Sequence, residues 1–228
     1  MPTWSDFFGG FDWAGLLTFF FTLAASLLCI TFHELSHGFA AYLLGDPTAK
    51  NAGRLTLNPI KHLDVLGLLM MVSVHVGWAK PVPIDMRHFK RPKRDMAITA
   101  LAGPLSNFVL TLVVLFLGRL LYNSGVNSAA AAYTILALMY IAVLSLGLGL
   151  FNLIPISPLD GSKILLSFLP DKICYTILRY ERYIALGMVL LAWLGVFSTP
   201  LDFFMGHTMN ALCKVTGFPY DLIAYFFL

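Results

Sequence analysis

Long apolar runs separated by short polar segments are the dominant pattern along the chain. The main runs lie at 14–32, 96–121, 129–154 and 183–197. A helix needs about 20 apolar residues to cross the roughly 30 Å of hydrocarbon in a bilayer, so these four runs predict the main membrane spans. A further apolar stretch at 65–78 is short for a span, and the Phe-rich tail at 203–228 leaves room for a last spanning or interfacial helix.

The segment after the first run predicts a departure from helical structure. Residues 51–59 combine the Asn58-Pro59 pair with a local alternation of apolar and polar residues, which is typical of a short edge strand. Pro81 and Pro83 favour an extended chain further on, because proline lacks an amide hydrogen and disfavours helix in the residue before it. We therefore expect an all-α polytopic membrane protein with about four to six transmembrane or re-entrant segments and a short β-strand or hairpin after the first helix.

Composition and charge agree with a membrane protein. Of the 228 residues, 58% are hydrophobic and 12% are charged, and the charged share is about half that of an ordinary soluble domain. Thirteen of the fifteen Lys and Arg residues fall in two segments, 50–94 and 163–182. Positive residues collect on the cytoplasmic side, so both segments are expected inside, and the N-terminus and the 123–128 connection outside. This topology favours re-entry at 65–78, because a crossing there would place the two basic segments on opposite sides.

The chain is interpreted as a multi-pass protein of the cell membrane. The basic run at 90–94 lies beside a predicted span, where such runs face anionic lipid headgroups, so no nucleic-acid partner is expected. The first apolar run has no Lys or Arg before it but has Asp6 and Asp12, so it is expected to remain as a span and not to be cleaved as a signal peptide. The lipid bilayer is thus one expected partner.

The end of the first run carries the strongest chemical pattern. His33, Glu34 and His37 form an HExxH pattern in a segment that has no Gly or Pro from Leu16 onward, so a single helix is expected to carry them. Histidines at i and i+4 share a helix face and can hold one Zn²⁺, while the adjacent Glu can take a proton from a metal-bound water. The alternative is a chance match or a structural histidine pair. An ionisable residue in a span costs about 2.5 to 3.5 kcal/mol, which favours a functional role.

A catalytic zinc site needs a third protein ligand, with the fourth tetrahedral position left to water. Cys29 faces the same side of the helix as His33 but lies about 12 Å along it from His37, too far to share the ion. Asp160 is the better candidate, because it follows the third main run at the same predicted membrane face, and two prolines break the helix before it. The other role open to Asp160 is to cap a helix that starts near residue 161.

Three motifs together resemble the site-2 protease family of intramembrane zinc metalloproteases. They are HELSH at 33–37, GPLSN at 103–107 and NLIPISPLDG at 152–161. The resemblance is best to the compact bacterial and archaeal branch, which has no PDZ domain. It implies one zinc ion per chain, held by His33, His37 and Asp160, with Glu34 as the general base.

The same resemblance implies that Asn107 and Asn152 position the substrate or stabilise the reacting carbonyl. Helix packing through an interhelical hydrogen bond explains Asn107 equally well, and Asn152 could instead bond backbone groups freed near Pro155. Residues 16–166 would form the catalytic core, and helices within 167–228 would complete a single membrane-embedded metalloprotease domain over 1–228.

The expected function is hydrolysis of peptide bonds in or near transmembrane segments of membrane-protein substrates, as in regulated intramembrane proteolysis. His33 follows the outer end of the first run by roughly 25 Å of helix, which places the active site toward the cytoplasmic side. A non-catalytic zinc-binding scaffold would keep the three ligands without needing Glu34. A metal transporter would distribute its ligands along a path, with no reason for a Glu beside the first His. A membrane zincin acting on soluble substrates would differ in what it cuts.

Overall fold

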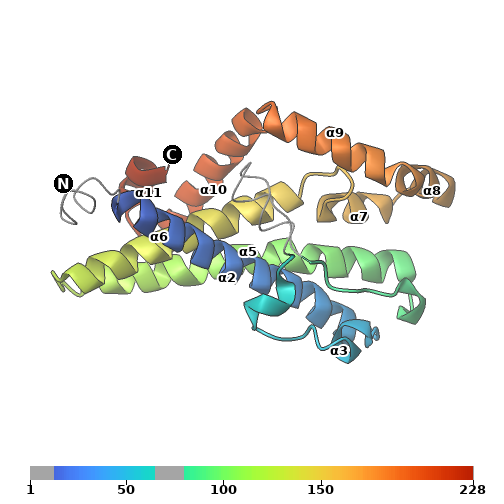
Figure 1. Ribbon diagram of the computed structural model, residues 1–228, viewed down its shortest axis with the longest axis horizontal. Coiled ribbons are helices and arrows are strands. Elements are labelled where there is room, and N and C mark those ends of the chain that lie inside the picture. Colours follow the sequence, from blue (N-terminus) through green and yellow to red (C-terminus); the bar gives the residue numbers. More distant parts are fainter. Residues whose placement is uncertain (1–12, 65–79, 228) are drawn as a thin grey trace, which may run out of the picture.

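The computed structural model describes residues 13–64 and 80–227, and its centre is a bundle of three long helices. These are α2 (Trp13–Leu43), α5 (Pro92–Asn123) and α6 (Ala129–Asn152), each of which packs against the other two. Figure 1 shows α2 and α6 running in the same direction with α5 opposed to both. Each helix is long and apolar enough to cross a membrane. The all-helical membrane architecture expected from the apolar runs is therefore found, with three continuous candidate spans.

The fourth predicted span is not a single straight helix. The run at 183–197 covers most of α9 (Glu181–Trp193) and the turn that follows it. The next helix, α10 (Ser198–Thr216), begins directly after the run and meets α9 at an angle of 77°. The 13 residues of α9 reach only about 20 Å, which is short for a crossing. Gly195 in the connection has φ of 74°, a left-handed conformation that glycine adopts readily. The two helices together make at most one broken span, which gives up to four spans in the described part of the chain.

The short strand predicted after the first helix is not found in the described residues. Residues 51–59 instead complete α3 (Thr48–Asn51), form a turn and enter the 3-10 helix η1 (Pro59–His62). The Asn58-Pro59 pair starts this helix, because the Asn58 side chain accepts a hydrogen bond from the amide of Ile60. A second 3-10 helix, η2 (Met86–His88), precedes α5. The stretch at 65–78, predicted to re-enter the membrane, lies outside the described residues.

Small and polar residues bring α5 and α6 close together. The carbonyl oxygen of Asn107 accepts hydrogen bonds from the hydroxyl of Thr111 at 2.9 Å and, across the interface, from that of Ser145 at 3.0 Å. Gly149 leaves little space, since a Cβ there would lie 3.3 Å from the Cβ of Asn107. Helices in lipid have no hydrophobic drive toward each other, so close packing and such interhelical bonds hold them together.

A buried apolar cluster and the polar residues of interest occupy different parts of the bundle. The cluster joins α5 and α6 to α10 and α11 (Tyr220–Phe227), and its buried members are Val114, Leu115, Met139, Ala142, Leu146, Met209, Cys213, Phe218 and Ile223. At the other end, α7 (Asp160–Leu166) packs on the early turns of α5, with α8 (Asp171–Arg179) beyond it (Figure 1). The candidate functional residues lie toward this second end.

Candidate metal centre

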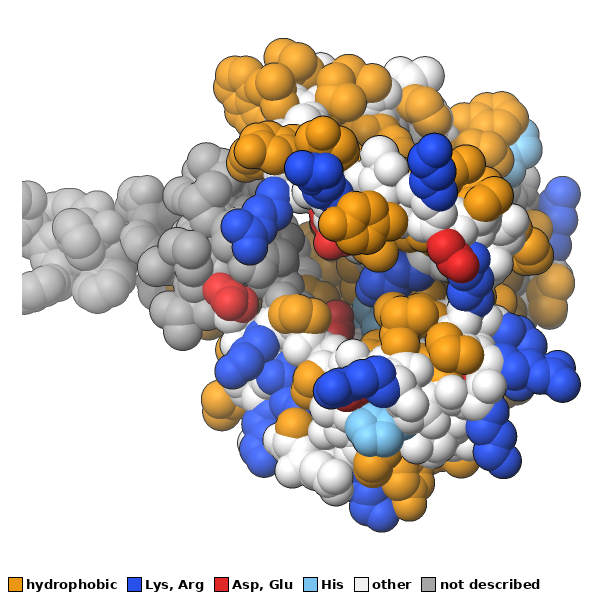
Figure 2. Space-filling view, turned by 90° about the vertical axis from the view of Figure 1, so that its right-hand side faces the viewer, with side chains coloured by type: hydrophobic (Ala, Val, Ile, Leu, Met, Phe, Trp, Pro, Cys, Tyr) orange, Lys and Arg blue, Asp and Glu red, His pale blue; other side chains and the backbone are white. Residues whose placement is uncertain are grey.

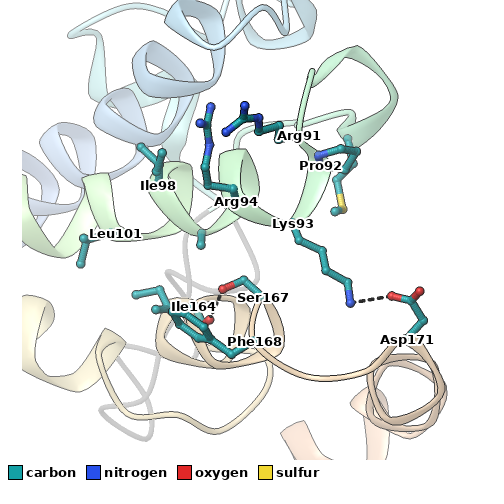
Figure 3. A pocket seen from close by; sticks show the side chains of 12 residues that line it. Arg91, Pro92, Lys93, Arg94, Ile98, Leu101, Ile164, Ser167, Phe168 and Asp171 are labelled. Carbon is teal, nitrogen blue, oxygen red and sulfur yellow. Dashed lines mark hydrogen bonds and ion pairs between the residues drawn. The ribbon is translucent and has the colours of Figure 1, made fainter.

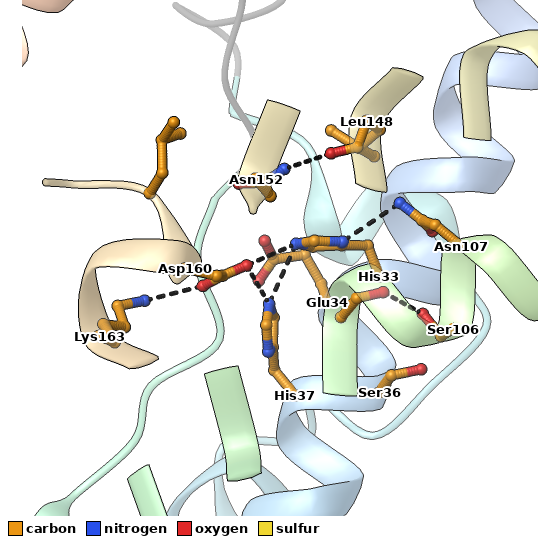
Figure 4. A network of polar contacts seen from close by, with 12 residues as sticks. His33, Glu34, Ser36, His37, Ser106, Asn107, Leu148, Asn152, Asp160 and Lys163 are labelled. Atoms are coloured by element: carbon orange, nitrogen blue, oxygen red, sulfur yellow. Dashed lines mark hydrogen bonds and ion pairs between the residues drawn. The ribbon is translucent and has the colours of Figure 1, made fainter. Parts of the chain in front are cut away.

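His33, His37 and Asp160 meet at one point, although Asp160 follows His33 by 127 positions. The two histidines lie one turn apart on α2, and Asp160 is the first residue of α7. The Oδ2 atom of Asp160 lies 3.1 Å from Nε2 of His33 and 3.0 Å from Nε2 of His37, and the two Nε2 atoms are 3.0 Å apart (Figure 4). All three side chains are buried. The structure thus brings together the three residues that the sequence predicted as ligands.

The chemistry of these three atoms suits a cation. Two imidazole nitrogens and a carboxylate oxygen each direct an electron pair toward the others, and so close an approach is favourable only with a proton or metal ion among them. Zinc accepts this donor set of two His nitrogens and one Asp oxygen, with the fourth tetrahedral position left open. No other group of three His, Cys, Asp or Glu residues suited to a metal occurs in the described part of the chain. Cys29, excluded on distance, lies instead with its Sγ 3.6 Å from the carbonyl oxygen of Ile141.

Further contacts hold the ligands from behind. Nδ1 of His37 lies 2.7 Å from the carbonyl oxygen of Thr99 on α5. Lys163, three residues after Asp160 on α7, donates from Nζ to Oδ1 of Asp160 at 3.1 Å. Burial raises the pKa of Asp160, but the contacts with the two histidine rings and the positive charge of Lys163 outweigh burial, so the pKa lies below its ordinary value. Asp160 is therefore an anionic side chain whose Oδ1 atom is fixed by a lysine, as suits a candidate metal ligand.

Glu34 shares a small cavity with the metal-binding group. The cavity has a volume of about 160 Å³, and its lining includes His33, Glu34, His37 and Asp160. Such a volume holds about five water molecules, at roughly 30 Å³ each. The Oε2 atom of Glu34 accepts a hydrogen bond from the backbone amide of Val82 at 2.9 Å. A carboxylate is thus present beside the metal-binding atoms, where a general base is required.

Val82 belongs to an extended segment, 80–85, that buried charged residues hold against the site. Nη2 of Arg54 donates to the carbonyl oxygens of Lys80 at 2.5 Å and Pro81 at 3.3 Å. At the other end, Oδ2 of Asp46 accepts a hydrogen bond from the amide of Asp85 at 2.7 Å. Arg54 lies in the loop where a strand was expected, and its role here is to anchor this neighbouring segment.

Two glycines from the sequence motifs leave space that the site requires. A Cβ on Gly103 would lie 2.7 Å from Cε1 of His33 and 2.5 Å from Cε1 of His37, both shorter than real contacts. A Cβ on Gly161 would lie 2.6 Å from the carbonyl oxygen of Ile154. Gly103 therefore lets α5 approach both imidazole rings, and Gly161 lets the turn before Asp160 fold closely over α7.

The two asparagines that were predicted to position the substrate occupy different places. Asn152 lines the cavity, and its Nδ2 donates to the carbonyl oxygen of Leu148 at 3.0 Å. Asn107 is fully buried behind His33, with Nδ2 3.2 Å from Nδ1 of that ring. Among the described residues, Oδ1 of Asn107 has no hydrogen-bond partner. A role in substrate positioning stays a prediction for both.

Three contributors to the site were not identified from the sequence: the carbonyl of Thr99, the amide of Val82 and the ammonium of Lys163. Lys163 had a usable signal, since a residue at i+3 on a helix lies beside residue i, here Asp160. The other two groups belong to the backbone of segments remote in sequence, and the side-chain pattern carries no sign of them.

The end of the molecule nearest the site is rich in Lys and Arg. Figure 2 looks onto this end and shows basic side chains gathered around a hollow. A groove of about 900 Å³ lies at the start of α5, lined there by Arg91, Lys93 and Arg94 and on the opposite side by Ile164 and Phe168 (Figure 3). Basic groups beside exposed apolar ones are typical of a surface at the boundary between a bilayer and the aqueous phase.

Two histidines one helical turn apart, a glutamate beside the first and a carboxylate from another helix define the site of a zinc metalloprotease. Comparison with known proteins agrees with this class. The sequence model described as "Peptidase family M50" matches residues 120–194. The "Putative zinc metalloprotease YwhC" of Bacillus subtilis is 40% identical over 177 residues, which are 77% of this chain and 78% of that protein. The chain therefore belongs to peptidase family M50 and is a zinc metalloprotease of that family.

A more distant relative covers less of the molecule. The "Putative zinc metalloprotease Rip2" of Mycolicibacterium smegmatis is 30% identical over 147 residues, which are 63% of this chain and 55% of that protein. No solved structure matches the chain. The resemblance to site-2 proteases that rested on three short motifs is confirmed by similarity that extends over most of the chain.

Proposed function

We propose that this protein is an intramembrane protease that hydrolyses peptide bonds in or beside transmembrane segments of membrane-protein substrates, as in regulated intramembrane proteolysis. The observation that carries the proposal is the meeting of His33, His37, Asp160 and Glu34 at one cavity within a bundle of apolar, membrane-length helices. A protease with its site between such helices meets its substrates in or at the edge of the bilayer.

One zinc ion per chain would be held by His33, His37 and Asp160. When bound, zinc supplies a Lewis acid that polarises a peptide carbonyl and makes water more acidic. Glu34 takes the proton of the attacking water and delivers it to the nitrogen of the leaving amine, so that a C–O bond forms and the C–N bond breaks. Water attacks directly, and the substrate is never attached to the protein.

The substrate must be locally extended at the site. A helical substrate has its carbonyl oxygens hydrogen-bonded within the helix, and the cavity of about 160 Å³ has no room for a helix, which is about 10 Å wide. Partial unwinding of the substrate therefore precedes cleavage. Asn152, which lines the cavity, is the better placed of the two asparagines to contact the unwound segment.

The site is proposed to face the cytoplasmic side of the cell membrane. The exposed basic residues Lys50, Lys61, Arg91 and Arg94 lie in the segments that connect the cytoplasmic ends of the proposed spans. Positive residues are retained on that side during insertion. Residues 16–166 would form the catalytic core and 167–228 would pack around it, giving one membrane-embedded metalloprotease domain over 1–228.

The test is to purify the chain in detergent, measure bound zinc and assay cleavage of a panel of single-span substrates. For Glu34→Gln we expect zinc content near one per chain, as in the wild type, and a rate reduced by about 10²- to 10⁴-fold, the usual contribution of a general base. Asp221→Asn, at an exposed position on α11, is the matched control and should cleave normally. Undiminished cleavage by Glu34→Gln would contradict the proposed role of Glu34 as the general base. Bound zinc without cleavage of any substrate by the wild type would favour a scaffold.

A further inference from the structure

The two histidines of the metal-binding group differ in what lies behind them. Nδ1 of His37 faces the carbonyl oxygen of Thr99, which can only accept a hydrogen bond. Nδ1 of His33 faces the side-chain amide of Asn107, and the amide nitrogen is the nearer end at 3.2 Å. In Figure 4 the contact with Asn107 lies on the opposite side of the His33 ring from Asp160. The hydrogen-bonding partner of a ring nitrogen decides which nitrogen carries the hydrogen.

Metal binding sets the tautomer of both rings. A neutral imidazole that offers the electron pair of Nε2 to a metal carries its hydrogen on Nδ1. For His37 this hydrogen points to the Thr99 carbonyl oxygen, and the contact is satisfied. For His33 the same hydrogen would point to the amide nitrogen of Asn107, so two donors would face each other at 3.2 Å. The orientation of the Asn107 amide is therefore the wrong one for a metal-bound His33.

The other end of the amide resolves this conflict. Oδ1 of Asn107 is buried and has no hydrogen-bond partner in the described part of the chain. The nitrogen and oxygen of an amide are nearly identical in shape, and a half-turn about the last side-chain bond exchanges them. Turning the amide breaks no hydrogen bond of Oδ1, so hydrogen bonding by Oδ1 does not choose between the two orientations. The tautomer required for metal binding does choose.

We propose that, with metal bound, Asn107 turns Oδ1 toward Nδ1 of His33 and accepts its hydrogen, and that Asn107 is thereby a positioning residue for the zinc ligand. The inference rests on the proposed zinc site. It gives both histidines the same support: an oxygen acceptor on α5 behind each ring, from the backbone at Thr99 and from the side chain at Asn107. Contacts of this kind fix the ring orientation and strengthen the ligand.

The backbone at Asn107 is fixed well enough for this role. Its carbonyl oxygen accepts hydrogen bonds from Thr111 and from Ser145, and its side chain is fully buried. Gly149 on α6 sits against its Cβ, which leaves the amide directed toward His33. The amide can turn while the helix stays in place.

The proposed support of His33 and a role in substrate positioning require opposite hydrogen-bonding roles of the Asn107 side chain. An asparagine that stabilises a substrate carbonyl must donate, whereas one that supports His33 must accept. Asn107→Asp keeps the acceptor and removes the donor, and Asn107→Leu removes both while keeping the side-chain volume close. Zinc affinity in these two variants therefore separates the roles, without recourse to activity.

The experiment measures zinc affinity of the detergent-purified full chain by competition with a chromophoric chelator. We expect Asn107→Leu to bind zinc about 10- to 100-fold more weakly, the usual effect of losing such a contact, and Asn107→Asp to bind at least as tightly as the wild type, because a carboxylate accepts the same hydrogen more strongly. Asn127→Leu, at an exposed position in the connection between α5 and α6, is the control and should bind as the wild type does.

Two outcomes would overturn the proposal: wild-type affinity in Asn107→Leu, or an equal loss in Asn107→Leu and Asn107→Asp. If Asn107→Leu fails to fold, its loss of zinc binding decides nothing. Asn107→Asp then provides the test, because it must still bind zinc for the proposal to stand. A wild-type chain that binds no zinc would instead remove the proposed zinc site itself, so failure of the two proposals can be told apart.

Discussion

At Gly103 the absence of a side chain is what lets α5 touch both histidine rings. We predict that Gly103→Ala displaces the rings, because the added Cβ would lie within 2.7 Å of atoms in His33 and His37. Zinc affinity should fall by at least about tenfold and cleavage should fall with it, since misplaced ligands bind metal poorly. Chelator competition and the cleavage assay measure the two effects.

Gly187→Ala provides the comparison for that substitution. Gly187 also lies in a helix, and no atom lies within 4 Å of a Cβ added there. The variant should match the wild type in zinc binding, with a small gain in helix stability from replacing glycine. If Gly103→Ala behaved like Gly187→Ala, the close packing of α5 on the histidine pair would have no functional importance.

Side-chain patterns predicted the candidate site residues that follow helical periodicity or lie at the end of a span. His33, Glu34 and His37 were identified because a metal and a base impose fixed spacings on one helix. Asp160 was identified because the end of one span and a following break place it at the same face as the HExxH segment. The contact of the Thr99 carbonyl with His37 and that of the Val82 amide with Glu34 come from backbone groups. The positions of these groups depend on tertiary packing, which no local sequence pattern reports.

Among the connecting elements, the segment at 80–85 depends on Asp46 just after α2. Asp46 is fully buried and accepts hydrogen bonds from the amides of Thr48 and Asp85, and its Oδ1 lies 3.2 Å from Nδ1 of His88. Burial raises the pKa of Asp46, but hydrogen bonds from the Thr48 hydroxyl and from these two amides, together with the nearby His88, lower it further, so the folded-state pKa lies below its ordinary value. The ionised carboxylate therefore stabilises the folded chain.

We predict that Asp46→Asn destabilises this connection by about 1–3 kcal/mol at neutral pH, because an amide group replaces an acceptor that faces several donors. A group with a lowered pKa stabilises above its unfolded-state value, and this effect is lost as pH falls through the folded-state value. The difference in Tm between the wild type and Asp46→Asn should therefore be largest above pH 4 and shrink at lower pH. A difference that stayed constant down to pH 2 would contradict the role of the charge, and Asp202→Asn, at an exposed site, should show none.

Apolar run length predicted α2, α5 and α6 well but failed for the run at 183–197. Hydropathy reports which residues avoid water and does not report where a helix bends. The signals of the bend, Gly195 and Pro200, lay within or just after the run and were outweighed by its apolar character. The prediction of a strand at 51–59 was wrong for a related reason. A short alternation of apolar and polar residues also occurs in turns and 3-10 helices, which are the structures that this loop forms.

For the molecule as a whole, the proposed orientation can be tested by thiol labelling. In a background with Cys29, Cys174 and Cys213 replaced by alanine, Asn127→Cys should react with an impermeant maleimide added to intact cells, because it lies in the turn between α5 and α6. Lys172→Cys, at the basic end, should react only after permeabilisation. The reverse pattern would place the metal-binding group on the outer side, and retained cleavage by the alanine background shows that the fold is intact.

The apolar cluster around Leu115 and Met209 is separate from the histidines, and this separation has a genetic consequence. Losing a zinc ligand should stop the chemistry while the packing that keeps the chain folded in the bilayer remains. Such a copy is expected to accumulate normally and to hold substrates that it cannot release as products. In a cell that makes both copies, the defective protein would then withhold substrate from the active one. The allele would be dominant-negative, with a stronger effect than a deletion.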